Sequence, residues 1–166
     1  MLVTLGIDPG KDGAVAILRD GELVHLLDVG DPELLDTMRL LSKGIEGRMI
    51  TYLERVHAMP KQGGVSMFSF GASFGWWRGV LDALQFSYVE ILPQKWQAGL
   101  VPKKRNKSDK PGLEVARKLF LNADLKLKKH HNRADALLLA YVAYQNHRNV
   151  EVVKQEKQTA MEILGL

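Results

Sequence analysis

Residues 2–19 read LVTLGIDPGKDGAVAILR, and this stretch decides the predicted fold. Its first apolar run indicates a buried strand that ends in Asp8 and is followed at once by Pro-Gly and Asp-Gly dipeptides. A second apolar run at residues 14–18 completes a pattern typical of a β-hairpin, with Asp8 near its open surface. A carboxylate at the end of a buried strand is unfavourable unless a positive group meets it. The alternative is that Asp8 only caps a turn, since Asp before Pro-Gly is common turn chemistry.

The composition is that of one ordinary globular domain. The chain has 166 residues, 46% of them hydrophobic and 25% charged, which is enough for one core. It contains no cysteine, which excludes disulfides, thiolate zinc sites and thiol nucleophiles. No apolar run approaches membrane-spanning length, and no basic-then-apolar leader opens the sequence. We therefore expect a soluble, cytoplasmic protein.

The net charge of +4 is unevenly distributed along the chain. Residues 95–133 carry twelve Lys or Arg and three acids, whereas residues 1–94 carry eight basic and twelve acidic residues. A solvated charged face is one explanation. The other is an enzyme that acts on a polyanion, which needs a basic block beside an acidic site. The densest part, residues 102–110 (PKKRNKSDK), fits an import-like run, a flexible linker or an arm that contacts phosphates, and we favour the arm.

Three antiparallel strands are expected first, because Asp20-Gly21 joins the hairpin to a third apolar run at residues 22–28. A helix that crosses the sheet follows, with Asp31 as its predicted N-cap and Pro32 as its first residue. Its predicted buried face consists of Leu34, Leu35, Met38 and Leu41. Further along, the pattern predicts a strand at 87–92, a short helix from Pro93 and a helix from Pro111.

A second strand, residues 48–56 (RMITYLERV), also leads to a carboxylate, that of Glu54. If the crossover helix makes this strand parallel to the first, the carboxyl ends of both strands meet at one edge of the sheet. Glu54 would then lie beside Asp8. The alternative is an exposed charge at a strand end.

Residues 65–86 have helical spacing and carry three glycines four residues apart: Gly71, Gly75 and Gly79. Such a stripe lets another backbone come close. Packing on the chain's own sheet is the favoured reason, and a helix-to-helix dimer contact is the second. Phe70, near the start of this helix, either joins the core or projects toward a ligand.

The last helical pattern, within residues 126–145, places His131 and Asp135 on one face, four residues apart. The residues after Asp135 (ALLLA) are suited to burial. Asp135 is then either a third member of the acidic site or a carboxylate that interacts favourably with the helix dipole at the N-terminus.

Three motifs in this order, GIDPGKDGAVAIL, YLERV and HHNRADALLLAYVA, resemble the RuvC-type Holliday junction resolvases of the ribonuclease-H-like superfamily, in a form similar to those of bacteriophages. The resemblance spans about residues 4–145. It implies an α/β fold: a mixed five-stranded sheet, three antiparallel strands then two parallel, with helices on both faces. The nuclease domain would cover residues 1–149 and a tail or short helix residues 150–166. A phage-encoded enzyme would work in the cytoplasm of its bacterial host.

The resemblance also implies a catalytic metal site formed by Asp8, Glu54 and Asp135, with His131 as the fourth ligand. In many bacterial relatives the fourth ligand lies three residues before the last acid, where this sequence has Asn132. Two Mg²⁺ ions per site are expected, and Mn²⁺ should also serve, because two such ions activate water and neutralise a phosphodiester during hydrolysis.

The implied function is endonucleolytic resolution of four-way or branched DNA junctions by a homodimer. The expected DNA contacts are Lys61, Phe68, Phe70, Lys103, Lys104, Arg105, Lys107, Lys110, Lys129, His130 and Arg133. The expected dimer contacts are Gly71, Gly75, Trp76 and Gly79. Two alternatives stay open: a non-cleaving nucleic-acid-binding module, and a fragment of an actin-like ATPase or kinase, for which 166 residues are too few for both lobes.

Overall fold

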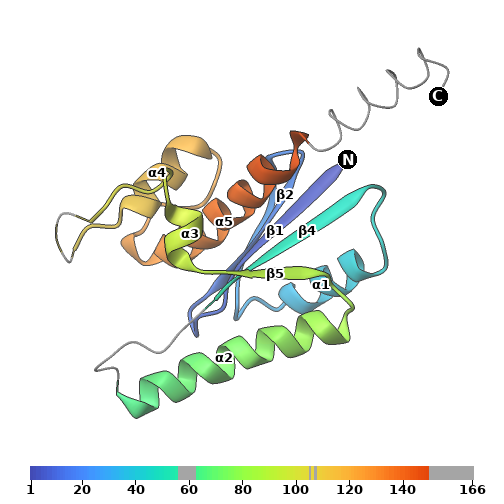
Figure 1. The fold of residues 1–166 in the computed structure, drawn as a ribbon, viewed down its shortest axis with the longest axis horizontal. Helices are drawn as coiled ribbons and strands as arrows, with labels where there is room; N and C mark the ends of the chain where they lie inside the picture. The colour runs from blue at the N-terminus through green and yellow to red at the C-terminus, as the bar shows by residue number, and fades with distance from the viewer. Residues whose placement is uncertain (56–62, 105, 107, 150–166) are drawn as a thin grey trace.

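A five-stranded mixed sheet forms the centre of the molecule, in the order β3-β2-β1-β4-β5 (Figure 1). The computed structural model describes residues 1–55, 63–104, 106 and 108–149. Its strands are β1 (Leu2–Asp8), β2 (Ala14–Arg19), β3 (Glu22–Asp28), β4 (Arg48–Glu54) and β5 (Tyr88–Ile91). The first three strands pair antiparallel, and β1–β4 and β4–β5 pair parallel. This arrangement confirms the predicted sheet.

Helices cover both faces of the sheet (Figure 1). Helices α1 (Leu34–Ser42) and α2 (Gly64–Ala83) lie on one side, and α3 (Pro93–Gln97), α4 (Pro111–Leu119) and α5 (His131–His147) lie on the other. A 3₁₀ turn, η1 (Lys128–His130), leads directly into α5. None of the helices in the described residues combines the length and hydrophobicity needed to cross a bilayer.

Alternation along the central strands creates two cores, one on each face of the sheet. On one face, Val3, Leu5 and Ile7 of β1 pack with the buried side chains of α1 and α2, which are Leu34, Met38, Trp77 and Leu81. On the other face, alternate residues of β2 pack with α5, whose buried side chains run from Ala134 to Ala143. Both faces of β1 and β2 are therefore buried, as their continuous apolar sequences predict.

Gly6 lets α5 lie directly on β1. A Cβ atom at Gly6 would collide with the Ala136 carbonyl oxygen and the Ala140 nitrogen. Only glycine permits this approach, because every other residue would place its side chain within the helix backbone. The contact fixes Ala136 over Gly6, two residues before the end of β1, and so holds its neighbour Asp135 near the carboxyl end of that strand.

Two details of α1 differ from prediction. The helix begins at Leu34 after Glu33, and the Asp31 carboxylate instead accepts a hydrogen bond of 2.7 Å from the Asp28 backbone N–H. Asp31 therefore closes the turn after β3 and does not cap the helix. Leu35, predicted on the buried face, is exposed, because Leu34 and Met38, one helical turn apart, face the sheet and the next residue along the helix points away from their face.

The glycine stripe of α2 faces away from the sheet. Among the described residues, nothing lies within 4 Å of a Cβ atom placed on Gly71, Gly75 or Gly79. The favoured explanation, packing on the chain's own sheet, is therefore wrong, because Trp77 and Leu81 supply that contact. The dimer contact stays a prediction.

Candidate metal centre

Three carboxylates come together at the carboxyl ends of β1 and β4. The parallel register pairs Ile7 with Leu53, so the next residues along each strand, Asp8 and Glu54, are neighbours. The start of α5 adds Asp135. Gly6 and Gly112 leave the space that this helix and its carboxylate occupy, since a Cβ atom on Gly112 would lie 2.9 Å from the Asp135 Oδ1 atom. Strand geometry thus brings Glu54 beside Asp8, as the sequence predicted.

Each of the three half-buried carboxyl groups has a raised pKa. Burial raises the pKa of Asp8 to about 6, against a hydrogen bond of 3.1 Å that the Gly10 backbone N–H donates to it. Burial, then the charges of Asp8 and Asp135, raise the pKa of Glu54 to about 8. Burial and the charge of Asp8 raise the pKa of Asp135 to about 7, against Lys104 and Lys110. The three groups are therefore close enough to repel one another.

Trp96 of α3 lies against this cluster. Its side chain is buried, and its indole nitrogen has no hydrogen-bond partner within normal distance in the described part of the chain. The indole N–H nevertheless acts on the Glu54 carboxylate, since it lowers the pKa of Glu54 against the effect of burial. A buried donor without a partner is unfavourable, so the indole is a ready donor for an ionised Glu54.

A cleft of about 640 Å³ opens beside Asp135 and is lined by His131, Lys103, Lys104 and Lys110. Burial, then the charges of Lys110 and Lys104, lower the pKa of His131, which favours the neutral imidazole. Its Nδ1 lies 3.3 Å from the Lys128 carbonyl oxygen. Because a carbonyl only accepts, this contact assigns the proton of the neutral ring to Nδ1 and the lone pair to Nε2.

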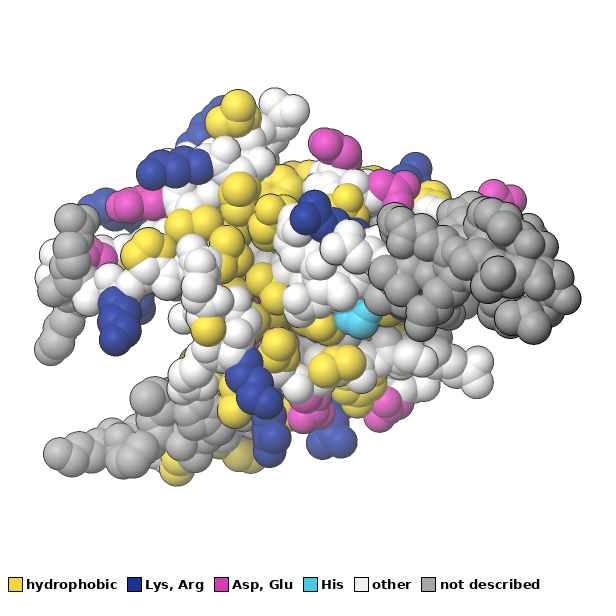
Figure 2. Space-filling model, turned by 45° about the horizontal axis from the view of Figure 1, so that its top comes forward, with side chains coloured by type: hydrophobic (Ala, Val, Ile, Leu, Met, Phe, Trp, Pro, Cys, Tyr) yellow, Lys and Arg dark blue, Asp and Glu magenta, His cyan; other side chains and the backbone are white. Residues whose placement is uncertain are grey.

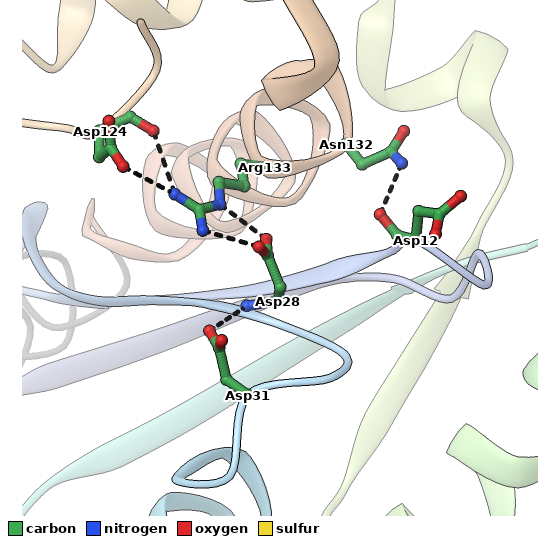
Figure 3. Close-up of polar contacts among 6 residues, drawn as sticks. All are labelled: Asp12, Asp28, Asp31, Asp124, Asn132 and Arg133. Carbon is green, nitrogen blue, oxygen red and sulfur yellow. Dashed lines mark hydrogen bonds and ion pairs between the residues drawn. The ribbon is translucent and has the colours of Figure 1, made fainter. Parts of the chain in front are cut away.

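Asn132, the other candidate for the fourth position, has a different place. Its side-chain nitrogen donates a hydrogen bond of 2.6 Å to the Asp12 carbonyl oxygen (Figure 3). It does not line the cleft of Asp135, whereas His131 does. His131 therefore shares a cleft with Asp135 and Asn132 does not, and the fourth position of the site stays a prediction.

The donor chemistry of the cluster suits a hard divalent cation. Carboxylate oxygens are the preferred ligands of Mg²⁺, and within the described residues none of the three carboxylates is in an ion pair. The side chains are not, however, gathered into a ready-made ligand set: no group of three His, Cys, Asp or Glu in the described chain is placed to hold a metal ion. The residues therefore fit a divalent ion in charge and chemistry, and binding one requires their side chains to draw closer together.

The predicted DNA contacts are spread over several elements. Lys103 and Lys104 are exposed and Lys110 is half-buried, all at the mouth of the Asp135 cleft. Phe68 and Phe70 lie on α2 and are 80% and 41% exposed. Lys61, Arg105 and Lys107 fall outside the described residues. On the face drawn in Figure 2, Lys and Arg side chains of the described chain are scattered among other residues and form no single patch.

Lys129, His130 and Arg133 surround the start of α5. Lys129 is exposed and His130 is buried. The Arg133 guanidinium binds both carboxylate oxygens of Asp28, at 2.6 and 2.7 Å, and a carboxylate oxygen of Asp124 at 3.0 Å (Figure 3). Arg133 therefore ties α5 to β3 and to the segment before η1, and a DNA phosphate would compete with two carboxylates for it.

Sequence reasoning gave no role to two groups near the cluster. Trp96 is one, and no local pattern distinguishes it from other core tryptophans. The Asp28 partner of Arg133 is the other, 105 residues away in the chain. Only the run of basic residues before α5 indicated that a compensating acid was needed.

Comparisons with known proteins bear on the fold. No protein-family model and no curated protein sequence matches this chain. A solved structure of Thermus thermophilus RuvC in complex with a Holliday junction substrate is similar, with a TM-score of 0.59 and 14% identity, over 89% of this chain and 96% of the other. A second Thermus thermophilus RuvC structure matches with a TM-score of 0.56 and 14% identity over the same shares. The chain therefore has a RuvC-like fold of the ribonuclease-H type, as its motifs predicted.

Proposed function

We propose that this protein is a metal-dependent endodeoxyribonuclease that resolves four-way DNA junctions by paired hydrolysis of phosphodiester bonds. One observation carries the proposal: the carboxylates of Asp8, Glu54 and Asp135 come from three separate elements to one edge of the sheet. There burial raises the pKa of all three, and the charge of Asp8 raises those of Glu54 and Asp135 further, with no ion pair in the described chain to compensate them. A cluster of this kind lowers the stability of the fold and is typical of a functional site. The likeness to RuvC in fold supports the same conclusion.

Asp8, Glu54, Asp135 and His131 are the residues that would hold two Mg²⁺ ions, for which Mn²⁺ would substitute. Such ions supply an activated water and neutralise charge on the phosphate. The chain itself contributes carboxyl oxygen donors, whose ionised form a bound cation would favour, and burial and neighbouring lysines lower the pKa of His131 and so favour its neutral form. Trp96 would offer its N–H to the Glu54 carboxylate and so favour the ionised form of that group.

Lys103, Lys104 and Lys110 would hold the DNA backbone beside the carboxylates. They line the same cleft as Asp135, and two of them lower its pKa, so their charges reach the site. Positive side chains beside acidic ones let a polyanion approach a negatively charged centre. Phe68 and Phe70, exposed on α2, are available to stack on bases at an opened junction.

We also propose a homodimer that pairs two such sites. A four-way junction has near two-fold symmetry, so two equal subunits match two strands to be cut. Exposed large apolar side chains on α2 (Val65, Met67, Phe68, Phe70 and Trp76) lie along the same helix as the open glycine stripe. The phage-like form, the cytoplasmic location and the division at residue 149 are proposals that rest on the sequence alone.

The test is a nicking assay on a labelled synthetic four-way junction with Mg²⁺ or Mn²⁺. We expect paired nicks from the parent protein, and no cleavage but near-normal junction binding from Asp8→Asn, Glu54→Gln and Asp135→Asn. Binding persists because affinity comes mostly from contacts to phosphates. Asp36→Asn, at an exposed carboxylate on α1, is the matched control and should cut normally. Near-parental cleavage by any of the three variants would contradict the role of that residue.

A second function, a non-cleaving nucleic-acid-binding module, is favoured by one observation. The described residues contain no ready-made set of three metal-binding side chains. Junctions bound but left uncut with both metals would support this module and contradict the nuclease. No observation favours an actin-like ATPase.

A further inference from the structure

A second cleft, of about 460 Å³, lies at the start of α5, between that helix and the turn that joins β1 to β2. Lys11, Lys129, His130 and Asn132 are among its lining residues. His131 lines both this cleft and the one that contains Asp135. The two clefts therefore meet at His131, beside the acidic cluster.

The free charge in this second cleft is positive. Asp28 and Arg133 also line it, but they neutralise each other through the two-point contact seen in Figure 3. The Arg133 contact lowers the pKa of Asp28, so this carboxylate stays ionised and paired. Lys11 and Lys129 are exposed and have no ion-pair partner among the described residues. Asp12 also lines the cleft, and its negative charge is smaller than the combined positive charge of the two lysines.

Helix α5 presents its N-terminus here without compensation. No side chain of the described residues caps it, and its first turn contains no acidic residue. The free N–H groups and the dipole of a 17-residue helix favour an anion at this end. The residue at its N-cap position, His130, is only 8% exposed, and its Nδ1 has no hydrogen-bond partner in the part of the chain that the structure describes. A buried polar atom without a partner, at the wall of a basic cleft, is an independent sign of a missing ligand.

We propose that this second cleft binds a backbone phosphate of the DNA strand, on the other side of His131 from the carboxylates. This inference rests on the proposed function. Lys11 follows Asp8 by three residues in the β1–β2 turn, so a phosphate held by Lys11 and the α5 N-terminus fixes the strand relative to Asp8. The two clefts would then bind one strand on both sides of the phosphodiester bond that is cut. A free phosphate has the same chemistry, and the experiment separates the two sources.

The experiment measures binding of four-way junctions in which single phosphates near the cleavage site are replaced by uncharged methylphosphonates. All proteins in this binding experiment carry Asp8→Asn, so that the DNA stays uncut, and the protein with this substitution alone serves as the parent. We expect two sensitive regions, one on each side of the cleavage site, where the replacement weakens binding roughly tenfold, a factor equal to about 1.4 kcal/mol. In Lys11→Met/Lys129→Met, one region should become insensitive and the other should stay sensitive. The slope of log affinity against log salt should fall by about 0.9 for each duplex phosphate that the variant no longer neutralises.

Lys43→Met/Lys118→Met removes two exposed lysines outside both clefts and is the control; it should keep both sensitive regions. Equal sensitivity at every position in the Lys11/Lys129 variant and its parent would overturn the inference. Inorganic phosphate that shifts the ¹⁵N resonances of the His130 ring, without any such DNA effect, would identify a free phosphate and also overturn it.

Cleavage of junctions by the protein with Asp8 intact separates this inference from the proposed function. Normal cleavage, with both regions still sensitive in the Lys11/Lys129 variant, would contradict the second phosphate site and support the nuclease. Loss of one sensitive region in a protein that never cuts would contradict the nuclease and support the phosphate site.

Discussion

Asp8 and Glu54 end two adjacent parallel strands one step beyond the pair Ile7 and Leu53, and the charge of Asp8 helps to raise the pKa of Glu54 to about 8. The fold itself does not require carboxylates at these two positions, because an apolar residue at either one would make the folded state more stable. Their cost to the fold depends on pH, and it can be measured.

We expect the metal-free protein to lose stability as pH rises from about 4 to about 8. The folded-state pKa values of Asp8, Asp135 and Glu54 are raised to about 6, 7 and 8, from ordinary values of 3.8, 3.8 and 4.5. A raised pKa means that the folded state binds the proton more tightly than the unfolded state does. Protonation therefore stabilises the fold fully below the unfolded-state pKa, and this stabilisation is lost as pH rises through the folded-state pKa. For each group, a tenfold difference in proton affinity between the folded and unfolded states is worth about 1.4 kcal/mol.

Thermal unfolding across this pH range is the measurement. Asp8→Asn should flatten the profile, because it removes one raised pKa and lowers two others, those of Glu54 and Asp135. Mg²⁺ should stabilise the parent more at pH 8 than at pH 5. A melting temperature that rises steadily from pH 4 to pH 8 without metal would contradict the raised pKa values.

Trp96→Phe should weaken the metal site with little change elsewhere. The substitution keeps an aromatic ring in the core and removes the N–H that lowers the pKa of Glu54. We expect that pKa to rise further, so the pH at which cleavage becomes half-maximal should move upward and Mg²⁺ affinity should fall.

Trp77→Phe is the matched control for Trp96. Trp77 is also fully buried and its indole nitrogen also lacks a partner among the described residues, but it packs on the opposite face of the sheet, against α1 and β1. Both variants should change the free energy of unfolding to a similar extent, because each replaces indole with phenyl. Equal pH profiles and Mg²⁺ affinities for the two variants would show that the Trp96 N–H has no part in the site.

His131→Ala should slow cleavage less than removal of a carboxylate, or change the preference between Mg²⁺ and Mn²⁺. A neutral nitrogen ligand suits Mn²⁺ better than Mg²⁺, so its removal should act unequally on the two. Asn132→Ala, which removes the hydrogen bond to the Asp12 carbonyl oxygen, is the comparison. An unchanged rate for His131→Ala with both metals, together with slower cleavage by Asn132→Ala, would transfer the fourth position to Asn132.

Much of this site could be predicted from sequence because it depends on short-range rules. Asp8 and Glu54 follow apolar strands, and parallel pairing alone brings such strand ends together. Asp135 was harder, because its approach depends on Gly6, which admits α5 onto β1. Helical spacing placed Asp135 on the face of His131, and the resemblance to RuvC supplied the rest.

What could not be predicted depends on distant partners. Arg133 reads as one more basic residue in a basic run, yet Asp28 on β3 engages it. Asp31 before Pro32 is a strong local signal for a helix cap, but the backbone N–H of Asp28 donates to its carboxylate instead. Local propensity identifies the candidates, and tertiary contacts choose among them.

Neutralising Lys103 and Lys104, together with Arg105 and Lys107, should weaken binding to every DNA structure. Lys103 and Lys104 are exposed at the mouth of the Asp135 cleft, where they can reach phosphates. The slope of log affinity against log salt should fall by roughly 0.9 for each duplex phosphate that is no longer neutralised. Titration of binding at several salt concentrations is the measurement, and an unchanged slope would show that these residues do not touch DNA.

Gly75→Leu should separate the subunits without unfolding them. Within the described chain nothing lies within 4 Å of a Cβ atom on Gly75, so the larger side chain meets open space within one subunit. Leucine also has the higher helix propensity, by up to about 1 kcal/mol, so the monomer should be at least as stable to heat. Any failure to assemble then reports on the contact between two α2 helices and not on the fold.

The assembly itself is measured by sedimentation, and its consequence by the pattern of nicks. A stripe of small residues flanked by exposed aromatic side chains such as Trp76, which is 43% exposed, permits close packing of two copies around a two-fold axis. The parent should sediment as a dimer and cut both strands of a junction together, whereas Gly75→Leu should sediment as a monomer and nick slowly and independently. Gly75→Ala, which adds one methyl group, should fall between them. A parent that is monomeric at micromolar concentration, both free and with junction bound, would contradict the dimer and leave the metal centre as it stands.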